Sequence, residues 1–132
     1  MVMDSDRLIA FLDICPIRPG HVQIIPREHF ACFEDLPSDL AGEITAMGQK
    51  IARAQKRLYN VERVAFLFTG GDIAHAHAHV VPIVEKTDIT SRRYIQEETL
   101  TFASTPQASA VELEAVARAL KGALSDAAQM KS

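Results

Sequence analysis

The sequence predicts an α+β fold in which an antiparallel sheet is covered by helices. Short apolar runs that end at Pro, Gly or charged residues are typical of strands. Two longer segments repeat their apolar residues every three or four positions, which is the period of an amphipathic helix. The first of these helices lies between two sets of strand-like runs, and the second closes the chain. This order places the protein in the α+β class.

The N-terminal strands form the first expected unit. The apolar run from Leu8 to Leu12 is closed by Asp13 and by the Pro and Gly residues of positions 16–20. It is predicted to be a buried strand followed by a turn. A second strand is expected from His21 to Ile25. Two strands joined by a longish loop favour an antiparallel hairpin.

A long helix is predicted from Ser38 to Tyr59. Its apolar positions recur at alternating steps of four and three, namely Leu40, Ile44, Met47, Ile51, Ala54 and Leu58. Pro37 suits the start of a helix, and Asn60 suits its end because Asn tolerates the left-handed conformation. The remaining faces are polar, so we expect this helix to lie on the sheet with one side in water.

The second half of the chain begins with two more strands. Val64 to Phe68 is short and apolar, the glycines at positions 70 and 71 break it, and His75 to Val84 follows as another strand-like run. These strands favour a sheet meander after the helix. A last amphipathic helix is predicted from Ala110 to Met130. The stretch from Thr87 to Thr105 has only weak periodicity and receives no assignment.

Length and composition favour one globular domain. With 132 residues, 48% hydrophobic and 23% charged, the chain is long enough for a single core and too short for two. We expect one domain over residues 1–132. Its motif-bearing region is residues 7–84, and a C-terminal loop and helix occupy residues 85–132.

Charge and hydropathy disfavour several classes of protein. The formal charge of −3 gives no basic track for a long nucleic acid. No apolar run reaches the roughly 18 to 20 residues that a membrane helix needs, and no signal peptide is recognisable. Two cysteines without a C-x-x-C pair disfavour a zinc ribbon or a disulfide framework. A cytoplasmic protein is the default expectation, with neither nucleic acid nor membrane as a partner.

The most informative motif consists of His75, His77 and His79, which alternate with alanines. Side chains alternate across a strand, so three imidazoles at steps of two are expected on one face. A merely solvent-exposed edge is a poor explanation, because other polar residues serve such a face as well as His does. Two chemical interpretations remain, a metal site and a nucleophile that attacks phosphorus.

A metal site fits the spacing only in part. The outer two α-carbons of the motif are about 13 Å apart on a strand, whereas zinc holds imidazole nitrogens at about 2.0 to 2.1 Å. One ion could therefore bind neighbouring histidines but hardly all three. A further ligand would have to come from Asp72, Asp88 or His29.

Nucleophilic catalysis fits the spacing better. Imidazole, with a pKa of about 6.5, is a good neutral nucleophile if a hydrogen bond at one nitrogen leaves the other free. Flanking imidazoles can orient the attacking ring and stabilise phosphate oxygens. The central residue, His77, is the natural attacker.

With this motif the sequence resembles the histidine triad (HIT) family, whose mark is His-x-His-x-His followed by apolar residues. A second, upstream motif matches the family in order and spacing. It comprises Phe11-Leu12-Asp13-Ile14-Cys15-Pro16, Pro19-Gly20-His21 and Ile24-Ile25-Pro26-Arg27-Glu28-His29. The resemblance covers roughly residues 7–84.

The resemblance implies a sheet of about five antiparallel strands, one long central helix, a homodimer and a cleft for a purine nucleotide. It implies no metal and no other cofactor in catalysis. His77 would attack the α-phosphate to form a nucleotidyl-histidine, and His79 would contact the phosphate and assist the leaving group. His75 and His29 would orient and polarise the triad.

The upstream motif implies further roles. Asp13 and Ile14 would meet the ribose and the base of the nucleotide. His21 matches a position that we interpret as structural, because a His beside Gly at the start of a strand more often satisfies backbone groups. A third histidine at position 79, rather than Gln, favours hydrolysis of a phosphoramidate or dinucleoside polyphosphate over nucleotide transfer.

The loop before the triad departs from the family pattern. It is short, and the backbone N–H groups of Gly70 and Gly71 are candidates for cradling an anion. Asp72 stands where a hydroxyl would meet the phosphate, and a carboxylate there should repel phosphate oxygens unless it is neutral, turned away or facing a cation. Two alternatives to a hydrolase therefore stay open, a nucleotide-binding sensor or scaffold with vestigial catalysis and a metal-binding His-strand protein.

Overall fold

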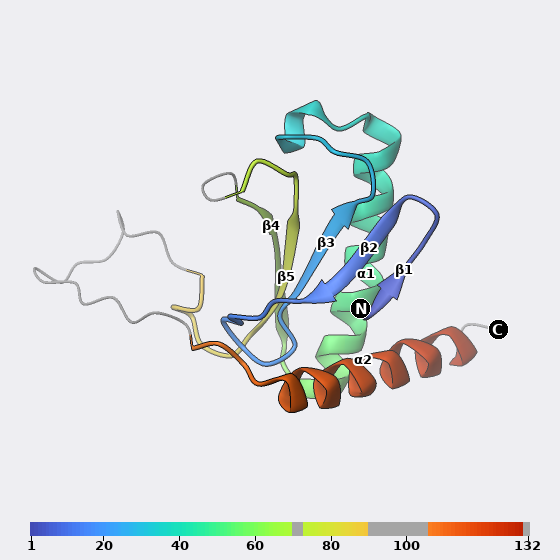
Figure 1. The fold of residues 1–132 in the computed structure, drawn as a ribbon. Coiled ribbons are helices and arrows are strands. Elements are labelled where there is room, and N and C mark those ends of the chain that lie inside the picture. Colours follow the sequence, from blue (N-terminus) through green and yellow to red (C-terminus); the bar gives the residue numbers. More distant parts are fainter. Residues whose placement is uncertain (70–72, 90–105, 131–132) are drawn as a thin grey trace, which may run out of the picture.

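The computed structural model describes residues 1–69, 73–89 and 106–130. Within this part of the chain, one antiparallel five-stranded sheet is formed in the order β1-β2-β3-β5-β4. Its strands are β1 (Met3–Asp4), β2 (Leu8–Leu12), β3 (Val22–Pro26), β4 (Arg63–Phe68) and β5 (Ala78–Ile83). A short 3-10 turn, η1 (Phe33–Asp35), precedes the first long helix. The predicted α+β class is confirmed (Figure 1).

The helix α1 spans Ser38–Tyr59, as the apolar period predicts. It ends where Asn60 adopts the left-handed conformation, with φ 52° and ψ 46°. Its buried apolar side chains include Leu40, Ile44 and Ile51, whereas most of its polar residues are exposed and Gln55 is the buried exception. The helix therefore covers one face of the sheet, where it contacts β3, β4 and β5 (Figure 1).

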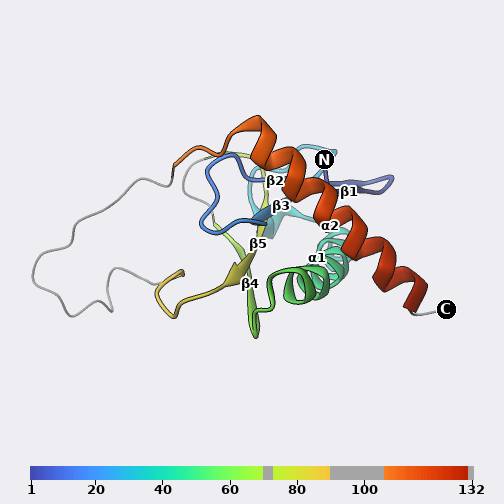
Figure 2. The ribbon, with the colours of Figure 1, turned by 90° about the horizontal axis from the view of Figure 1, so that it is seen from below.

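The helix α2 spans Ala110–Met130, again with the predicted bounds. It begins after Ser109, whose Oγ accepts the N–H of Glu112 at 3.2 Å. The helix runs across α1 (Figure 2), and the guanidinium of Arg57 donates to the main-chain oxygen of Ala123 at 2.7 Å. Among the described residues, no helix is long and apolar enough to cross a membrane.

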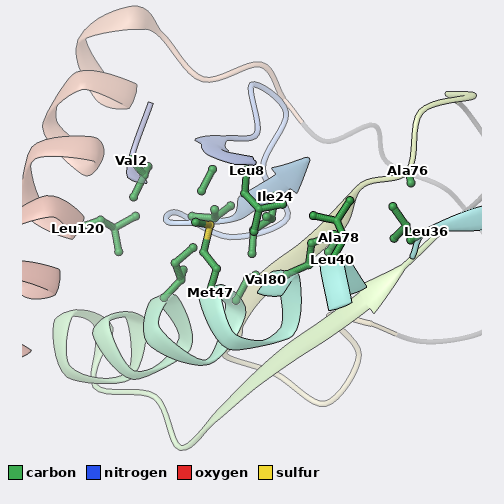
Figure 3. Close-up of a cluster of buried hydrophobic side chains, with 14 residues drawn as sticks. Val2, Leu8, Ile24, Leu36, Leu40, Met47, Ala76, Ala78, Val80 and Leu120 are labelled. Carbon is green, nitrogen blue, oxygen red and sulfur yellow. The ribbon is translucent and has the colours of Figure 1, made fainter. Parts of the chain in front are cut away.

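The main core fills the space between the sheet and the two helices. Figure 3 shows Leu8 and Ile24 from the sheet opposite Leu40 and Met47 of α1, with Leu120 of α2 closing one side. All five side chains are buried. Burial of an aliphatic side chain of this size stabilises the fold by about 1.5 to 3 kcal/mol. The alternation of buried and half-buried residues along β3 places one face of the sheet in this core.

Two features of the sheet differ from the expectation. The two-residue strand β1 has no apolar pattern of its own and exists because Met3 pairs with Ala10 and Asp4 with Ile9. The strand β5 begins at Ala78, not at His75, because the pairing of β3 and the pairing of β4 with β5 both end at Ala78. The two residues that precede Ala78 therefore have no ladder partners and can turn out of the sheet.

A buried polar side chain holds β3 and β5 in register beneath the candidate site. The Gln55 amide of α1 donates to the main-chain oxygens of Gly20, at 2.8 Å, and Val80, at 3.0 Å. Gly20 has a φ of 91°, and the ring of Tyr59 occupies the place where a Cβ would stand. The fixed conformation at Gly20 thereby positions His21 directly before β3.

Candidate active site

His77 lies directly before β5, and only 7% of the residue is exposed. Its Nδ1 lies 2.8 Å from the main-chain oxygen of His75. A carbonyl oxygen can only accept, so Nδ1 carries the proton, and Nε2 of the neutral ring holds a lone pair. The main chain is anchored at this point, because the N–H of Ala76 donates to the oxygen of Phe30 at 2.6 Å. The fold thus selects the tautomer in which Nε2 is a nucleophile.

His21, which is buried, and His79, which is half-buried, form a pair beside His77 that we call the inner pair. Nε2 of His21 lies 2.9 Å from Nδ1 of His79, and the two ring centroids are 5.1 Å apart. The ring of His77 packs edge-on against His79, with centroids 4.9 Å apart. His21 is only 3% exposed. The pair forms because β3 and β5 are neighbours with Gln23 opposite His79.

Both rings of the inner pair favour the neutral state. Burial lowers the pKa of His21 to about 4, and the neighbouring carboxylate of Asp13 opposes this shift without cancelling it. Burial also lowers the pKa of His79, and the nearby His77 adds to that effect. At neutral pH the inner pair therefore presents hydrogen-bonding groups without a formal charge.

Asp13 is held at the edge of the inner pair by two donors. The N–H of Cys15 donates to Oδ1 at 2.8 Å, and the amide of Gln23 donates to Oδ2 at 2.7 Å. The second oxygen also lies 3.6 Å from Nε2 of His21. Each carboxylate oxygen has a further lone pair, so the group can still accept a hydrogen bond from a ligand.

His75 and His29 form a second pair, the outer pair. Their Nδ1 atoms are 3.1 Å apart, and Nε2 of His75 lies 3.2 Å from the main-chain oxygen of Pro26. Because that oxygen accepts, Nε2 of His75 carries its proton and Nδ1 accepts from His29. The ring of His75 is half-buried and that of His29 is exposed. His75 thus orients His77 with its main-chain carbonyl, while its own ring faces His29.

Within the described part of the chain, the group that best matches a metal site is Asp13, His21 and His79, whose ligand atoms lie within 4.8 Å of one another. The hydrogen bonds oppose this use. The N–H of Ile17 donates to Nδ1 of His21 at 3.1 Å, so the neutral ring carries its proton on Nε2, the atom that would bind the ion. Of the further ligands named from the sequence, His29 belongs to the outer pair, Asp72 lies outside the described residues and Asp88 is engaged elsewhere.

Asp88 anchors the loop that carries Asp13. Its carboxylate accepts both Nε and an Nη of Arg18, at 2.9 and 2.8 Å, and also the N–H groups of Val84 and Glu85. These bonds, led by that from Arg18, lower the pKa of Asp88 to about 2. The ion pair ties the loop before β3 to the turn after β5, so the two segments that flank the inner pair are fixed to each other.

Most of the residues that the sequence singles out come together here. His77 and His79 are in ring contact, and Asp13 lies against His21. Ile14 is 56% exposed next to Asp13. The predicted contributions of Gly70, Gly71 and Asp72 lie outside the described residues.

Sequence reasoning assigned no chemical role to His21 or Thr69. Both touch His79, since Oγ1 of Thr69 lies 3.2 Å from its Nε2. His21 does satisfy a backbone group, as expected, but its other nitrogen meets the candidate catalytic cluster. The Pro-Gly-His step was the available signal for His21, and for Thr69 it was its place directly before the two glycines of the short loop.

Comparison with known proteins identifies the family of this chain. Residues 1–86 match the family model described as HIT domain. An uncharacterised HIT-like protein of Saccharolobus solfataricus is 33% identical over 87 residues, which are 62% of this chain and 63% of that protein. The adenosine 5'-monophosphoramidase of Saccharomyces cerevisiae is 34% identical over 74 residues, 55% of this chain and 47% of the enzyme. The chain thus spans less than two thirds of the length of these two relatives.

The fold also matches a solved structure. A hypothetical histidine triad nucleotide-binding protein of Sulfolobus tokodaii superposes with a TM-score of 0.74 and 18% sequence identity. The match covers 95% of this chain and 83% of the other. This likeness extends the agreement beyond the motif region to the fold of nearly the whole chain.

Proposed function

The chain belongs to the HIT family, and from this premise we propose that it is a nucleotide hydrolase with His77 as its nucleophile. The substrate is a nucleoside phosphoramidate or a dinucleoside polyphosphate, cleaved at the α-phosphate. The phosphoramidase names of the yeast relatives support the first of these, at 34% and 33% identity.

The observation that carries the proposal is the tautomer of His77. The hydrogen bond from its Nδ1 to the oxygen of His75 leaves the lone pair of Nε2 available for attack. In the first step a bond forms between Nε2 and the α-phosphorus while the bond to the leaving group breaks, and the leaving group takes up a proton. In the second step water cleaves the phosphorus–nitrogen bond, which returns a proton to solvent, releases the nucleotide and restores the free ring.

The remaining site residues take supporting roles in this proposal. His79 contacts the phosphate and assists the leaving group through its Nε2–H, which is shared with Thr69 as a bifurcated donor. His29 acts indirectly by holding the ring of His75. The free lone pairs of Asp13 accept from the ribose hydroxyls, and the exposed side chain of Ile14 offers an apolar surface to a purine base. The proposal extends to Gly70, Gly71 and Asp72 as phosphate neighbours.

We also propose that the protein acts as one domain and as a homodimer. Leu120 of α2 belongs to the same core as α1 and the sheet, which supports the single domain. In the described sheet, β4 is an edge strand, and its Phe66 is 39% exposed. An open edge with an apolar side chain suits pairing with a second copy.

The test measures turnover of adenosine 5'-phosphoramidate and of a diadenosine polyphosphate by wild type and His77→Ala, with and without a chelator. We expect turnover that the chelator does not change and that the substitution reduces by at least about 1,000-fold. Mass spectrometry of wild type quenched with denaturant at alkaline pH, where the phosphorus–nitrogen bond survives, should detect a nucleotidyl group on His77.

Three other results would point elsewhere. Turnover retained by a folded His77→Ala protein would contradict the nucleophile. Nucleotide binding without turnover on either substrate would favour the sensor. Activity lost to the chelator, together with zinc that survives dialysis, would favour the metal protein.

A further inference from the structure

A directional chain of hydrogen bonds runs through the inner pair. It begins at the main-chain N–H of Ile17, which can only donate and which meets Nδ1 of His21 at 3.1 Å. The neutral ring of His21 therefore carries its proton on Nε2 and donates it to Nδ1 of His79 at 2.9 Å. A fixed backbone donor thus sets the tautomers of two side chains.

The same logic continues to Thr69. Because Nδ1 of His79 accepts, the proton of this neutral ring is on Nε2, which lies 3.2 Å from Oγ1 of Thr69. Thr69 therefore accepts this bond, and its own hydroxyl proton is left to donate elsewhere. Each hydrogen bond points outward, and the series ends at the hydroxyl of the exposed Thr69, which has no acceptor among the described residues.

The ring of His79 links this donor to the nucleophile. Oγ1 of Thr69 lies 3.2 Å from Nε2 of His79, and the ring of His77 packs edge-on against the same imidazole. Thr69 follows directly after Phe68, whose pairing with Ala78 is the last of the β4–β5 ladder. The donor and the attacking ring therefore both lie against His79.

We propose that Thr69 is a catalytic residue whose hydroxyl donates to one non-bridging oxygen of the phosphate that His77 attacks. This inference rests on the function proposed above and adds a contact that the triad motif does not contain. The hydroxyl changes no bonds and transfers no proton. It stabilises the negative charge that the phosphate oxygens carry as Nε2 approaches phosphorus.

The series of hydrogen bonds makes the Thr69 hydroxyl a stronger donor than that of an isolated threonine. Hydrogen bonds that point the same way polarise one another, so donation from His79 to Oγ1 strengthens the donation from Thr69 to phosphate. The buried members of the chain fix its direction before substrate arrives, so little reorganisation is needed during the reaction. The donor also compensates for the absence of a charged group in the inner pair at neutral pH.

The experiment compares Thr69→Val, which keeps the shape and removes the hydroxyl, with Thr69→Ser, which keeps the hydroxyl. Each is assayed with adenosine 5'-phosphoramidate and with the two diastereomers of its phosphorothioate analogue, in which sulfur replaces one non-bridging oxygen. We expect kcat to fall about 10- to 100-fold in Thr69→Val and to stay within about threefold in Thr69→Ser. The expected loss corresponds to the removal of one donor to the transition state.

The phosphorothioates distinguish a direct contact between Thr69 and the phosphate from a purely structural role of Thr69. In wild type, sulfur at the position facing Thr69 slows one diastereomer more than the other, because sulfur accepts hydrogen bonds poorly. In Thr69→Val this preference should shrink about tenfold, since no hydroxyl remains to distinguish the two oxygens. A variant that only loosened the fold would slow both diastereomers alike and leave their ratio unchanged.

Each negative result has its own meaning. Thr69→Val with the rate and diastereomer ratio of wild type would overturn this inference while leaving the His77 nucleophile in place. A reduced rate with an unchanged ratio would also overturn it. No turnover by wild type, or turnover that survives in His77→Ala, would overturn the proposed function and this inference together.

Discussion

The inner pair, His21 and His79, and the outer pair, His29 and His75, bring the same side chains to nearly the same separation in different environments. Their ring centroids are 5.1 and 5.0 Å apart. In the inner pair His21 is buried and His79 half-buried, and the pair is tied to a backbone N–H and shifted toward the neutral state. The outer pair is linked to a carbonyl, and His29 is exposed. Burial and the kind of backbone group, not ring proximity, decide what each pair can do.

This difference shows how the side chains of one short histidine motif come to have different protonated nitrogens. A backbone N–H donates to the inner pair, so the N–H groups of its rings point away from the main chain. A backbone carbonyl accepts from the outer pair, so the N–H of His75 points toward the main chain. His77 lies between them and takes its own tautomer from the carbonyl of His75. The two pairs should therefore respond very differently to the same substitution.

The largest effect is expected from breaking the inner pair. His21→Leu removes the donor that sets the tautomer of His79, and we expect kcat for the phosphoramidate to fall about 100-fold. His21→Gln retains an N–H that can reach His79 and should recover at least a tenth of the wild-type rate. Steady-state kinetics on both variants, with circular dichroism to verify folding, measures this. Wild-type kcat in a folded His21→Leu protein would contradict the role given to the inner pair.

A smaller effect should appear in stability against pH. The pKa of His21 is lowered to about 4 in the folded protein, from the ordinary value of about 6.5, so the unfolded chain binds more protons between those values. The contribution of neutral, buried His21 to the free energy of unfolding is complete above about pH 6.5 and is lost as the pH falls toward 4. A tenfold difference in proton affinity between the folded and unfolded protein corresponds to about 1.4 kcal/mol of unfolding free energy.

Urea unfolding at pH 7, 5.5 and 4.5 measures this loss. Carboxylates also titrate on acidification, so the comparison with His21→Gln isolates the histidine. We expect a shallower decline of the urea midpoint in the variant than in wild type. Parallel declines would show that burial of His21 does not contribute to acid sensitivity.

The smallest effect should follow a change in the outer pair. His29→Asn removes one partner of the His75 ring, which is itself one step removed from His77. We expect kcat to fall by no more than about threefold and unfolding free energy to change by less than about 0.5 kcal/mol, as is usual for exposed side chains. A loss comparable to that of His21→Leu would erase the distinction between the two pairs.

The sequence predicts the elements better than the contacts between them. Both long helices have the predicted bounds because amphipathic periodicity is a local property. The two-residue β1 and the start of β5 depend on which neighbours pair, and no local pattern carries that information. The contacts of His21 and Thr69 with His79 could not be predicted for the same reason, because they arise only from the order in which β3, β5 and β4 pair. His77, by contrast, stood out because its neighbours in the motif share its chemistry.

The neutral character of the inner pair also bears on how the protein captures its ligand. A hydrogen-bond chain that ends in a hydroxyl has a dipolar field, which fades with distance faster than that of a cation. The whole chain has a formal charge of −3, so an anionic nucleotide meets mild repulsion at long range. Added salt should therefore raise the association rate slightly, whereas it would lower the association rate at a lysine-rich phosphate site. The protein then distinguishes one anion from another only after contact.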